Sequence, residues 1–298
     1  MLKWLTALGA FWAAQVAVAQ VVGWWTFEEG TPGQVPVVGP SILDVSGNGH
    51  NGSGAGELVY ADGRATPVAL DFRGDGGRVR IPDSADFHLR GGFTLECYLW
   101  LESVGTSCCN KRYLLFRGDR RAGRDPWYLA VNDDGSLAVQ VWDGAEEIRL
   151  DADEEIQLGE WTHVAGVFDA DAGALRLYLN HELIAQLGGV PPPAGDLVPS
   201  QAPGVAIGNS RFTADEGVEG VIDEARISAG ALSPDDFLPL IKPCRADLYG
   251  YGELTIFDFF VFQGYFGLGD LRADFDGDGE LTVFDFLEFQ TEFSTACQ

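Results

Sequence analysis

The sequence predicts a mainly β protein in which an antiparallel β-sandwich precedes a small helical module. Short apolar stretches alternate with turn signals through most of the chain, which is typical of antiparallel sheets. The composition agrees, because the chain has 39 glycines, 8 tryptophans and 19 phenylalanines but a single methionine. Helical spacing of apolar residues is concentrated near the C-terminus. We therefore expect one large sandwich over residues 20–240 and a separate module over residues 243–298.

Residues 1–19 have the features of a secretory signal peptide. Lys3 supplies the early positive charge, an apolar run covers residues 4–14, and Ala17-Val18-Ala19 offers small residues for cleavage. The apolar run is too short to cross a bilayer as a helix. We therefore expect a protein that is secreted, extracellular or attached to the cell surface, and that is not an integral membrane protein.

The net charge narrows the classes of partner. Acidic residues number 45 and basic residues 19, which gives a formal charge of −26 at pH 7. Such a chain repels the phosphates of nucleic acids and of anionic membranes, so neither is expected as a partner. The excess of carboxylates suits an extracellular protein that uses calcium.

The expected strands follow one another between residues 21 and 227. Within residues 93–101, strict alternation puts Cys97 and its apolar neighbours on one face. Asn180-His181 is expected to form a two-residue hairpin turn, and Ser233-Pro234 to begin a short helix. The strands are expected at residues 21–27, 68–72, 78–81, 93–101, 128–131, 137–142, 161–168, 175–179, 183–187, 204–207 and 220–227.

A series of short motifs accompanies these strands in chain order. They are Trp25-Thr-Phe-Glu28, Asp44-Val-Ser-Gly-Asn48-Gly, Ala69-Leu-Asp71-Phe, Phe93-Thr-Leu-Glu-Cys97, Trp161-Thr-His163-Val-Ala, Leu177-Tyr-Leu-Asn180, Ile207-Gly-Asn and Gly220-Val-Ile-Asp223-Glu-Ala-Arg-Ile227. Their order resembles the laminin-G-like, concanavalin A-like jelly roll over about residues 21–238. The resemblance implies an antiparallel jelly-roll β-sandwich.

The same resemblance implies a structural Ca²⁺ site in the sandwich. Glu28, Asp44 and Asp223 match acidic landmarks near which members of this fold class hold Ca²⁺. Asn48 and loop carbonyls would complete the coordination shell. Asp44 and Asn48 could equally stabilise a turn, and both interpretations stay open.

No pattern of catalytic residues falls within the expected strands. Glycoside hydrolases on the related fold carry closely spaced acids on one strand, whereas the nearest acidic cluster here, residues 151–155, is expected in a solvated turn. His163 is expected to be a hydrogen-bonded sheet histidine. We therefore expect a sandwich that binds without catalysis. Trp127 and Trp142 lie beside turns and are candidates for stacking on sugar rings, although at least one is expected in the core.

The chain has five cysteines, an odd number. Cys244 and Cys297 bracket the C-terminal module, and a disulfide between them would close it. Cys97 is expected on the inward face of its strand, either as a free thiol or bonded to one of two adjacent cysteines. Those two, Cys108 and Cys109, could instead form a vicinal bridge.

A calcium-binding loop is expected at residues 274–285. Carboxylates occupy loop positions 1, 3, 5 and 12, and Gly279 permits the sharp turn at position 6. The carbonyl of Glu280 would fill position 7, and Thr282 would act through water. The four carboxylates are those of Asp274, Asp276, Asp278 and Asp285.

The segment that starts at Ala273 repeats one that starts at Ala246. After each loop the phenylalanines have helical spacing, so each copy is a loop followed by a short helix, and the two helices are expected to pack on each other. Tyrosines replace two carboxylates in the first loop. The weak ligands that remain there are Asp247, Thr255 and Asp258.

This tandem resembles a dockerin, the duplicated calcium-loop module that attaches secreted proteins to a scaffold or cell surface, in its bacterial form bracketed by two cysteines. The resemblance implies Ca²⁺ as the cofactor and a scaffold or cell-envelope partner. Loop positions 10 and 11, which contact the partner, are polar in many dockerins. Here they are Ile256-Phe257 and Val283-Phe284.

Two functions of different classes follow from these patterns. In the first, the jelly roll binds a glycan or a surface partner, as an accessory to polysaccharide breakdown, while the C-terminal module attaches the protein. In the second, the protein is a purely structural, calcium-stabilised surface component with no glycan ligand. A hydrolase with an unrecognised site is the weakest hypothesis.

Overall fold

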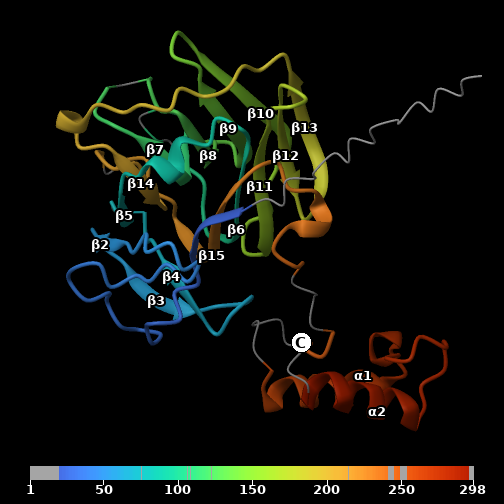
Figure 1. The fold of residues 1–298 in the computed structure, drawn as a ribbon. Helices are drawn as coiled ribbons and strands as arrows, with labels where there is room; N and C mark the ends of the chain where they lie inside the picture. Colours follow the sequence, from blue (N-terminus) through green and yellow to red (C-terminus); the bar gives the residue numbers. More distant parts are fainter. Residues whose placement is uncertain are drawn as a thin grey trace, which may run out of the picture.

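Two antiparallel sheets form the body of the protein in a computed structural model (Figure 1). The structure describes residues 20–74, 76–105, 107, 109–121, 123–213, 215–240, 245–248 and 254–294. The expected signal peptide lies outside these ranges. The strands that the sequence predicts are all present within them, and the expected β-sandwich is confirmed.

The three longest strands of the first sheet, β11, β6 and β15, lie next to one another in its middle. Over the described residues its order is β13-β12-β11-β6-β15-β4-β3, with β1 paired to β15. The strands are β1 (Gln20–Trp25), β3 (Val59–Asp62), β4 (Val68–Asp71), β6 (Phe93–Leu101), β11 (Trp161–Asp169), β12 (Ala174–Leu179), β13 (Glu182–Gly188) and β15 (Gly220–Ala229).

The second sheet faces the first across the core. Its order is β10-β9-β8-β7-β14-β5-β2. The strands are β2 (Ser53–Ala55), β5 (Arg78–Pro82), β7 (Arg112–Gly118), β8 (Trp127–Val131), β9 (Ser136–Trp142), β10 (Glu147–Glu155) and β14 (Gly204–Ile207). Single turns of 3-10 helix at Ala85–His88, Pro199–Gln201 and Pro234–Asp236 lie in the connections, the last of them where Ser233-Pro234 predicts a helix start.

Alternating side chains fill the space between the sheets. On β6, Phe93, Leu95 and Cys97 are fully buried, as the alternation predicts. The ring of Phe93 lies 5.7 Å from that of Phe168 and 6.3 Å from that of Trp127 on the opposite sheet. Burial of each such side chain stabilises the fold by about 2–3 kcal/mol. The core therefore joins the two sheets into one unit.

The hairpin between β12 and β13 shows how a local sequence sets the backbone. Asn180 and His181 have φ values of 48° and 69°, so both turn residues adopt the left-handed conformation. Two successive residues with positive φ give the twist that a tight antiparallel hairpin requires. The predicted two-residue turn is therefore confirmed.

Four strands, β2, β3, β7 and β10, are absent from the sequence prediction. Residues 151–155 lie on β10 and not in a turn, where Asp151 is paired with Ala138. β10 is an edge strand whose acidic side chains point to solvent, and charges on an edge oppose pairing with another chain. The strand β7 is not predicted, because a register shift between Tyr113 and Leu115 breaks its alternation.

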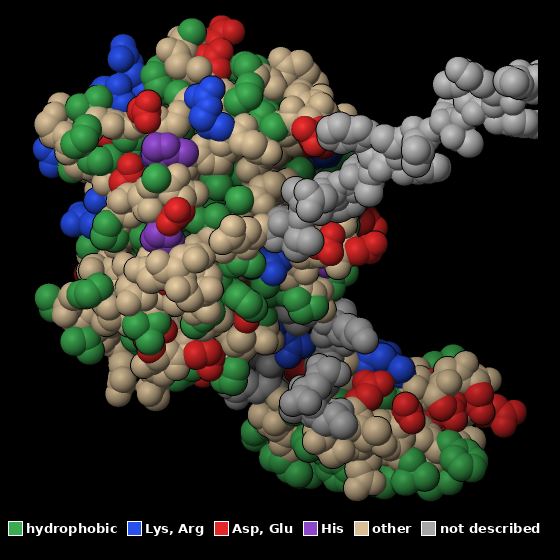
Figure 2. Space-filling view, viewed as in Figure 1, with side chains coloured by type: hydrophobic (Ala, Val, Ile, Leu, Met, Phe, Trp, Pro, Cys, Tyr) green, Lys and Arg blue, Asp and Glu red, His purple; other side chains and the backbone are tan. Residues whose placement is uncertain are grey.

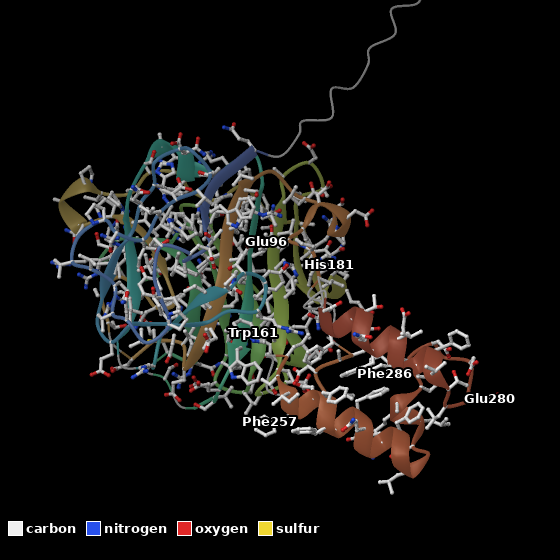
Figure 3. The ribbon with its side chains drawn as sticks, turned by 90° about the horizontal axis from the view of Figure 1, so that it is seen from below. Glu96, Trp161, His181, Phe257, Glu280 and Phe286 are labelled. Carbon is white, nitrogen blue, oxygen red and sulfur yellow. The ribbon has the colours of Figure 1, made fainter. Side chains whose placement is uncertain are left out.

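Two helices, α1 (Ile256–Leu268) and α2 (Val283–Ser294), pack side by side near the C-terminus (Figures 1 and 3). Phe262 stacks on Phe289 with ring centroids 4.3 Å apart, and Phe275 contacts both rings. Figure 3 shows Phe286 pointing between the helices and Phe257 pointing away from them. The predicted helix pair is confirmed, whereas its dockerin-like identity stays a prediction. Neither helix, nor any other in the described chain, has the length and apolarity to span a bilayer.

Candidate functional site

A cavity of about 350 Å³ opens on the outer face of the second sheet. Its floor comes from β7, which contributes Tyr113 and Phe116. Its walls come from the connection before β7 and from the β7–β8 and β14–β15 connections. The wall residues that matter for its chemistry are Lys111, Asp119, Asp125, Ser210, Phe212, Thr213 and Glu216.

Aromatic rings form the apolar part of the cavity. Tyr113 lies 4.8 Å from Phe116 and 5.0 Å from Tyr128 of β8, in edge-to-face geometry. Phe212 meets Phe116 at 6.4 Å and is only half-buried, so its ring faces the open space. Lys111 places its Nζ 4.8 Å from the centre of the Tyr128 ring, a cation–π contact.

Besides Asp119, which forms an ion pair with Arg121, two carboxyl groups give the cavity its polar character. Burial raises the pKa of Asp125 to about 8, against the lowering effect of Lys111, and the nearby charge of Glu216 raises it further. Asp125 therefore keeps its proton at neutral pH and can both donate and accept a hydrogen bond. Glu216 accepts a hydrogen bond from Thr213 Oγ1 at 2.6 Å. Ser210 Oγ lies 3.0 Å from the same Thr213 oxygen.

This combination of rings and hydrogen-bonding groups suits a polyhydroxylated ligand. Aromatic surfaces accept the C–H faces of a sugar ring, and carboxyl and hydroxyl groups bond its hydroxyls. The sequence reasoning missed this cavity because β7 was not predicted. The signal that was available is the run Tyr113-Leu-Leu-Phe116, in which two aromatic residues face outward on either side of the register shift.

The two tryptophans predicted to stack on sugar rings lie elsewhere. Trp127 is fully buried, and its indole N–H donates to the carbonyl of Phe87 at 3.1 Å. The stacking role predicted for Trp127 is therefore wrong, and its alternative as a core residue is confirmed. Trp142 is half-buried, and the guanidinium of Arg124 lies 5.9 Å from its ring centre.

The acids of the predicted sandwich calcium site are bonded to separate loops. Asp44 Oδ1 accepts from the amides of Trp24 and Ser46, and its Oδ2 accepts from that of His50. Asn48 Nδ2 donates to the carbonyls of Val21 and Val22. These contacts are those of a stabilised turn, the alternative interpretation of this pair.

The other two acids bind the segment that precedes β4. Asp223 is fully buried, and its Oδ2 accepts from the amides of Arg64, Ala65 and Thr66 at 2.8, 2.8 and 3.2 Å. Glu28 Oε1 accepts from the amide of Val68 at 2.7 Å. Among the described residues these acids do not gather into a group that could hold a metal. Calcium binding by the sandwich remains a prediction.

His163 belongs to a buried polar cluster on the outer face of the first sheet. Its Nε2 lies 2.9 Å from Glu96 Oε2, and Arg226 Nε donates to Glu96 Oε1 at 2.8 Å. Figure 3 shows Glu96 and His181 on this side of the sandwich. The backbone amide of Leu238 donates to Glu96 Oε2. The backbone carbonyl of Leu238 lies 2.9 Å from His181 Nε2. The cluster therefore fastens the segment after β15 to the sheet.

The cysteine predictions are only partly covered by the described residues. Cys97 is fully buried and unbonded, and burial raises the pKa of its thiol far above the ordinary value, so it behaves as a small apolar side chain. Cys109 is exposed beside the cavity. Cys108, Cys244 and Cys297 lie outside the described residues, and so do the bridges predicted for them.

Three carboxylates of the predicted calcium loop gather in space. Ligand oxygens of Asp274, Asp276 and Asp278 all lie within 4.8 Å of one another. Asp274 accepts from the amides of Gly277 and Gly279 at 2.8 and 3.0 Å, which wraps the loop around its carboxylate. Glycine is required at both positions, because their φ values are 76° and 85°.

Four of the remaining predicted ligands, Asp285, Thr282, Thr255 and Asp258, bond backbone amides at the starts of the two helices. Asp285 is fully buried, and its two oxygens accept from the amides of Phe275, Asp276 and Thr282. Thr282 Oγ1 accepts from the amide of Phe284, and the amide of Glu280 donates to Asp278. In the first copy, Thr255 and Asp258 form a capping box at the start of α1. Asp247 lies before this helix, beyond residues that the structure does not describe.

Comparison with known proteins agrees with this fold. A family model described as the concanavalin A-like lectin/glucanases superfamily, Laminin_G_3, matches residues 73–236. The pentraxin-related protein PTX3 of Bos taurus is 32% identical over 96 residues, which is 31% of this chain and 22% of that protein. The match thus spans less than a quarter of the curated relative.

Two solved structures illustrate the likeness of the fold. Domain 4 of AbnA, an extracellular arabinanase from Geobacillus stearothermophilus, in complex with arabinotriose, has a TM-score of 0.52 and 21% identity, over 73% of this chain and 96% of that one. The binding domain of Paraclostridial Mosquitocidal Protein 1 also has a TM-score of 0.52, with 15% identity, over 73% of this chain and 50% of that one. The predicted jelly roll is confirmed by the family match, which covers more than half of the sequence. The chain therefore belongs to the Laminin_G_3 family of concanavalin A-like lectin/glucanases.

Proposed function

We propose that the protein is a secreted, non-catalytic recognition protein whose jelly roll binds a glycan in the cavity on the outer face of the second sheet. The observation that carries this proposal is the cavity itself, in which Phe212 offers a half-buried ring next to Asp125 and Glu216. The structure of the arabinanase domain, described as a complex with arabinotriose, supports a saccharide as the ligand class.

The C-terminal helices supply the attachment part of the proposal. Asp274, Asp276 and Asp278 present oxygens close enough to surround one hard cation, which fits Ca²⁺. Bound Ca²⁺ would supply charge neutralisation that lets the loop close. Ile256, Phe257, Val283 and Phe284 are more than half exposed, and we propose that they contact a scaffold or cell-envelope partner.

A glycan array with the full-length mature protein tests the ligand. We expect binding to a restricted set of saccharides, and we expect Phe212→Ala to weaken it by about tenfold, because one stacking contact contributes about 1–1.5 kcal/mol. Phe284→Ala is the matched control, since it removes an equally large exposed ring from α2.

Two outcomes would decide against the proposal. Absence of any hit on the array favours the purely structural alternative. Release of products from a bound polysaccharide, lost in Asp125→Asn or Glu216→Gln, identifies a hydrolase in which these two carboxyl groups act as the acid and base.

A further inference from the structure

A second, more open cavity of about 500 Å³ lies on the same outer face, next to β5 and β2. Its walls include proline rings, Ser53 of β2, and the guanidinium groups of Arg80 and Arg211. Arg80 points outward from β5, and Arg211 comes from the β14–β15 connection. The only carboxylate in its lining is that of Asp83.

We call this second cavity the groove. Its two arginines, Arg80 and Arg211, have no carboxylate within ion-pair distance among the described residues. Arg211 Nη1 donates to the carbonyls of Ile81 and Val205 at 2.9 and 3.1 Å, and its buried Nε has no partner. Arg80 is exposed and makes no ion pair within the described chain. Asp83 makes its hydrogen bonds to Arg117, at 2.8 and 3.1 Å, and acts on Arg211 only through its more distant charge.

A third arginine, Arg78, lies close to this pair. Burial lowers the pKa of both Arg78 and Arg211, and the charge of Arg80 lowers each of them further, so the guanidinium groups repel one another. The charges of Glu216 and Asp83 offset part of this effect, on Arg78 and Arg211 respectively. This happens in a chain with a formal charge of −26. Figure 2 shows basic side chains along the left side of the sandwich, where Figure 1 places β5 and β14. An anion would relieve the repulsion.

The groove lies next to the first cavity, the one lined by aromatic rings, which we call the aromatic cavity. Ser210 and Phe212 line the aromatic cavity, while Arg211, between them in the sequence, lines the groove. A single short connection therefore presents a stacking ring to one side and a guanidinium to the other. Guanidinium groups form paired, charge-assisted hydrogen bonds with carboxylate and sulfate oxygens.

We propose that this groove binds an anionic substituent, a carboxylate or a sulfate ester, of the glycan whose ring lies in the neighbouring cavity. The proposal deepens the proposed function and rests on it for the identity of the ligand as a glycan. Such a groove would favour acidic saccharides over neutral ones. Arg80 supplies the accessible charge, and Arg211 supplies a fixed second donor held by the backbone of β5 and β14.

Calorimetric titration of the full-length mature protein with three galactose-based trisaccharides tests the selection. One is neutral, one carries carboxylates as galacturonate, and one carries sulfate esters. We expect the wild type to bind an acidic trisaccharide at least tenfold more tightly than the neutral one, and Arg80→Gln to remove that advantage. Arg80→Lys should retain part of it. Whichever acidic trisaccharide binds more tightly identifies the substituent.

The control is Arg90→Gln, which removes the same charge from an exposed arginine that lines neither cavity. Equal weakening by both variants, or an unchanged preference in Arg80→Gln, overturns the proposal. Phe212→Ala should weaken all trisaccharides that bind, which reports on the proposed function separately. If no trisaccharide binds, titration with inorganic sulfate decides. Shifts of the Arg80 and Arg211 Nε NMR signals show an anion site without a glycan, and unchanged signals refute the site.

Discussion

Asp125 shows how strongly its surroundings set the chemistry of a single residue. An aspartate in an unfolded chain has a pKa of about 3.9, and in the folded protein burial raises the pKa of Asp125 to about 8. Between these values the folded state keeps a proton that the unfolded state releases. The contribution of Asp125 to stability is therefore fully present at acidic pH, declines as the pH rises towards 8, and is lost above it.

The Asp125→Asn variant tests this linkage. Because asparagine does not titrate, the free energy of unfolding should depend less steeply on pH between about 5 and 8. The difference in slope should be on the order of 1 kcal/mol per pH unit. Denaturant titrations at several pH values measure it. Asp153→Asn, at an exposed position of β10, should leave the slope unchanged. Parallel profiles for wild type and Asp125→Asn would show that Asp125 is ionised at neutral pH.

At the scale of single elements, the helix pair depends on a few aromatic contacts. Phe262 is 2% exposed and stacks on Phe289, whereas Phe260 on the same helix is 55% exposed. Phe262→Ala should destabilise the pair by about 3 kcal/mol, and Phe260→Ala by less than about 0.5 kcal/mol. Hydrogen exchange of the α1 and α2 amides in the full-length protein measures both changes. Similar effects of the two variants would contradict the arrangement of the helices.

The calcium loop gives a second prediction at this scale. Asp274, Asp276 and Asp278 repel one another in a closed loop, so Ca²⁺ binding should stabilise α2 and the helix packed on it. Calorimetry of the full-length protein should show one tight site in this loop, abolished by Asp276→Ala combined with Asp278→Ala. Calcium should also slow hydrogen exchange in both helices. Two equivalent sites, or exchange that calcium does not change, would be evidence against it.

Elements with a regular local pattern could be predicted from the sequence, and those shaped by tertiary contacts could not. The alternation on β6 and the Asn180-His181 turn are local signals, and both are found in the structure. The register shift in β7 arises from pairing with β8, and it hides the aromatic face of the cavity. Trp127 lies beside a turn in sequence, but as the first residue of β8 it packs against Phe93 of the opposite sheet and is fully buried.

Over the whole molecule, opposing electrostatic effects operate at two distances. The excess of carboxylates repels itself over the entire surface, whereas the groove at Arg80 and Arg211 is a local exception. Salt screens both, with a Debye length of about 10 Å at 0.1 M. The global and the local effects should therefore respond to salt in opposite directions.

Raising NaCl from about 10 mM to about 150 mM should increase the melting temperature of the calcium-free protein by a few degrees, because a formal charge of −26 destabilises the compact state when it is unscreened. The same change should weaken binding of an acidic trisaccharide by several-fold, since salt competes for the guanidinium groups of Arg80 and Arg211. Neutral saccharides should bind equally at both salt concentrations. Differential scanning calorimetry and isothermal titration measure the two responses on one sample. If the net negative charge of the protein repelled the acidic trisaccharide, salt would screen that repulsion and raise the affinity. An affinity for the acidic trisaccharide that increases with NaCl would therefore mean that the net charge, and not the groove, dominates its binding.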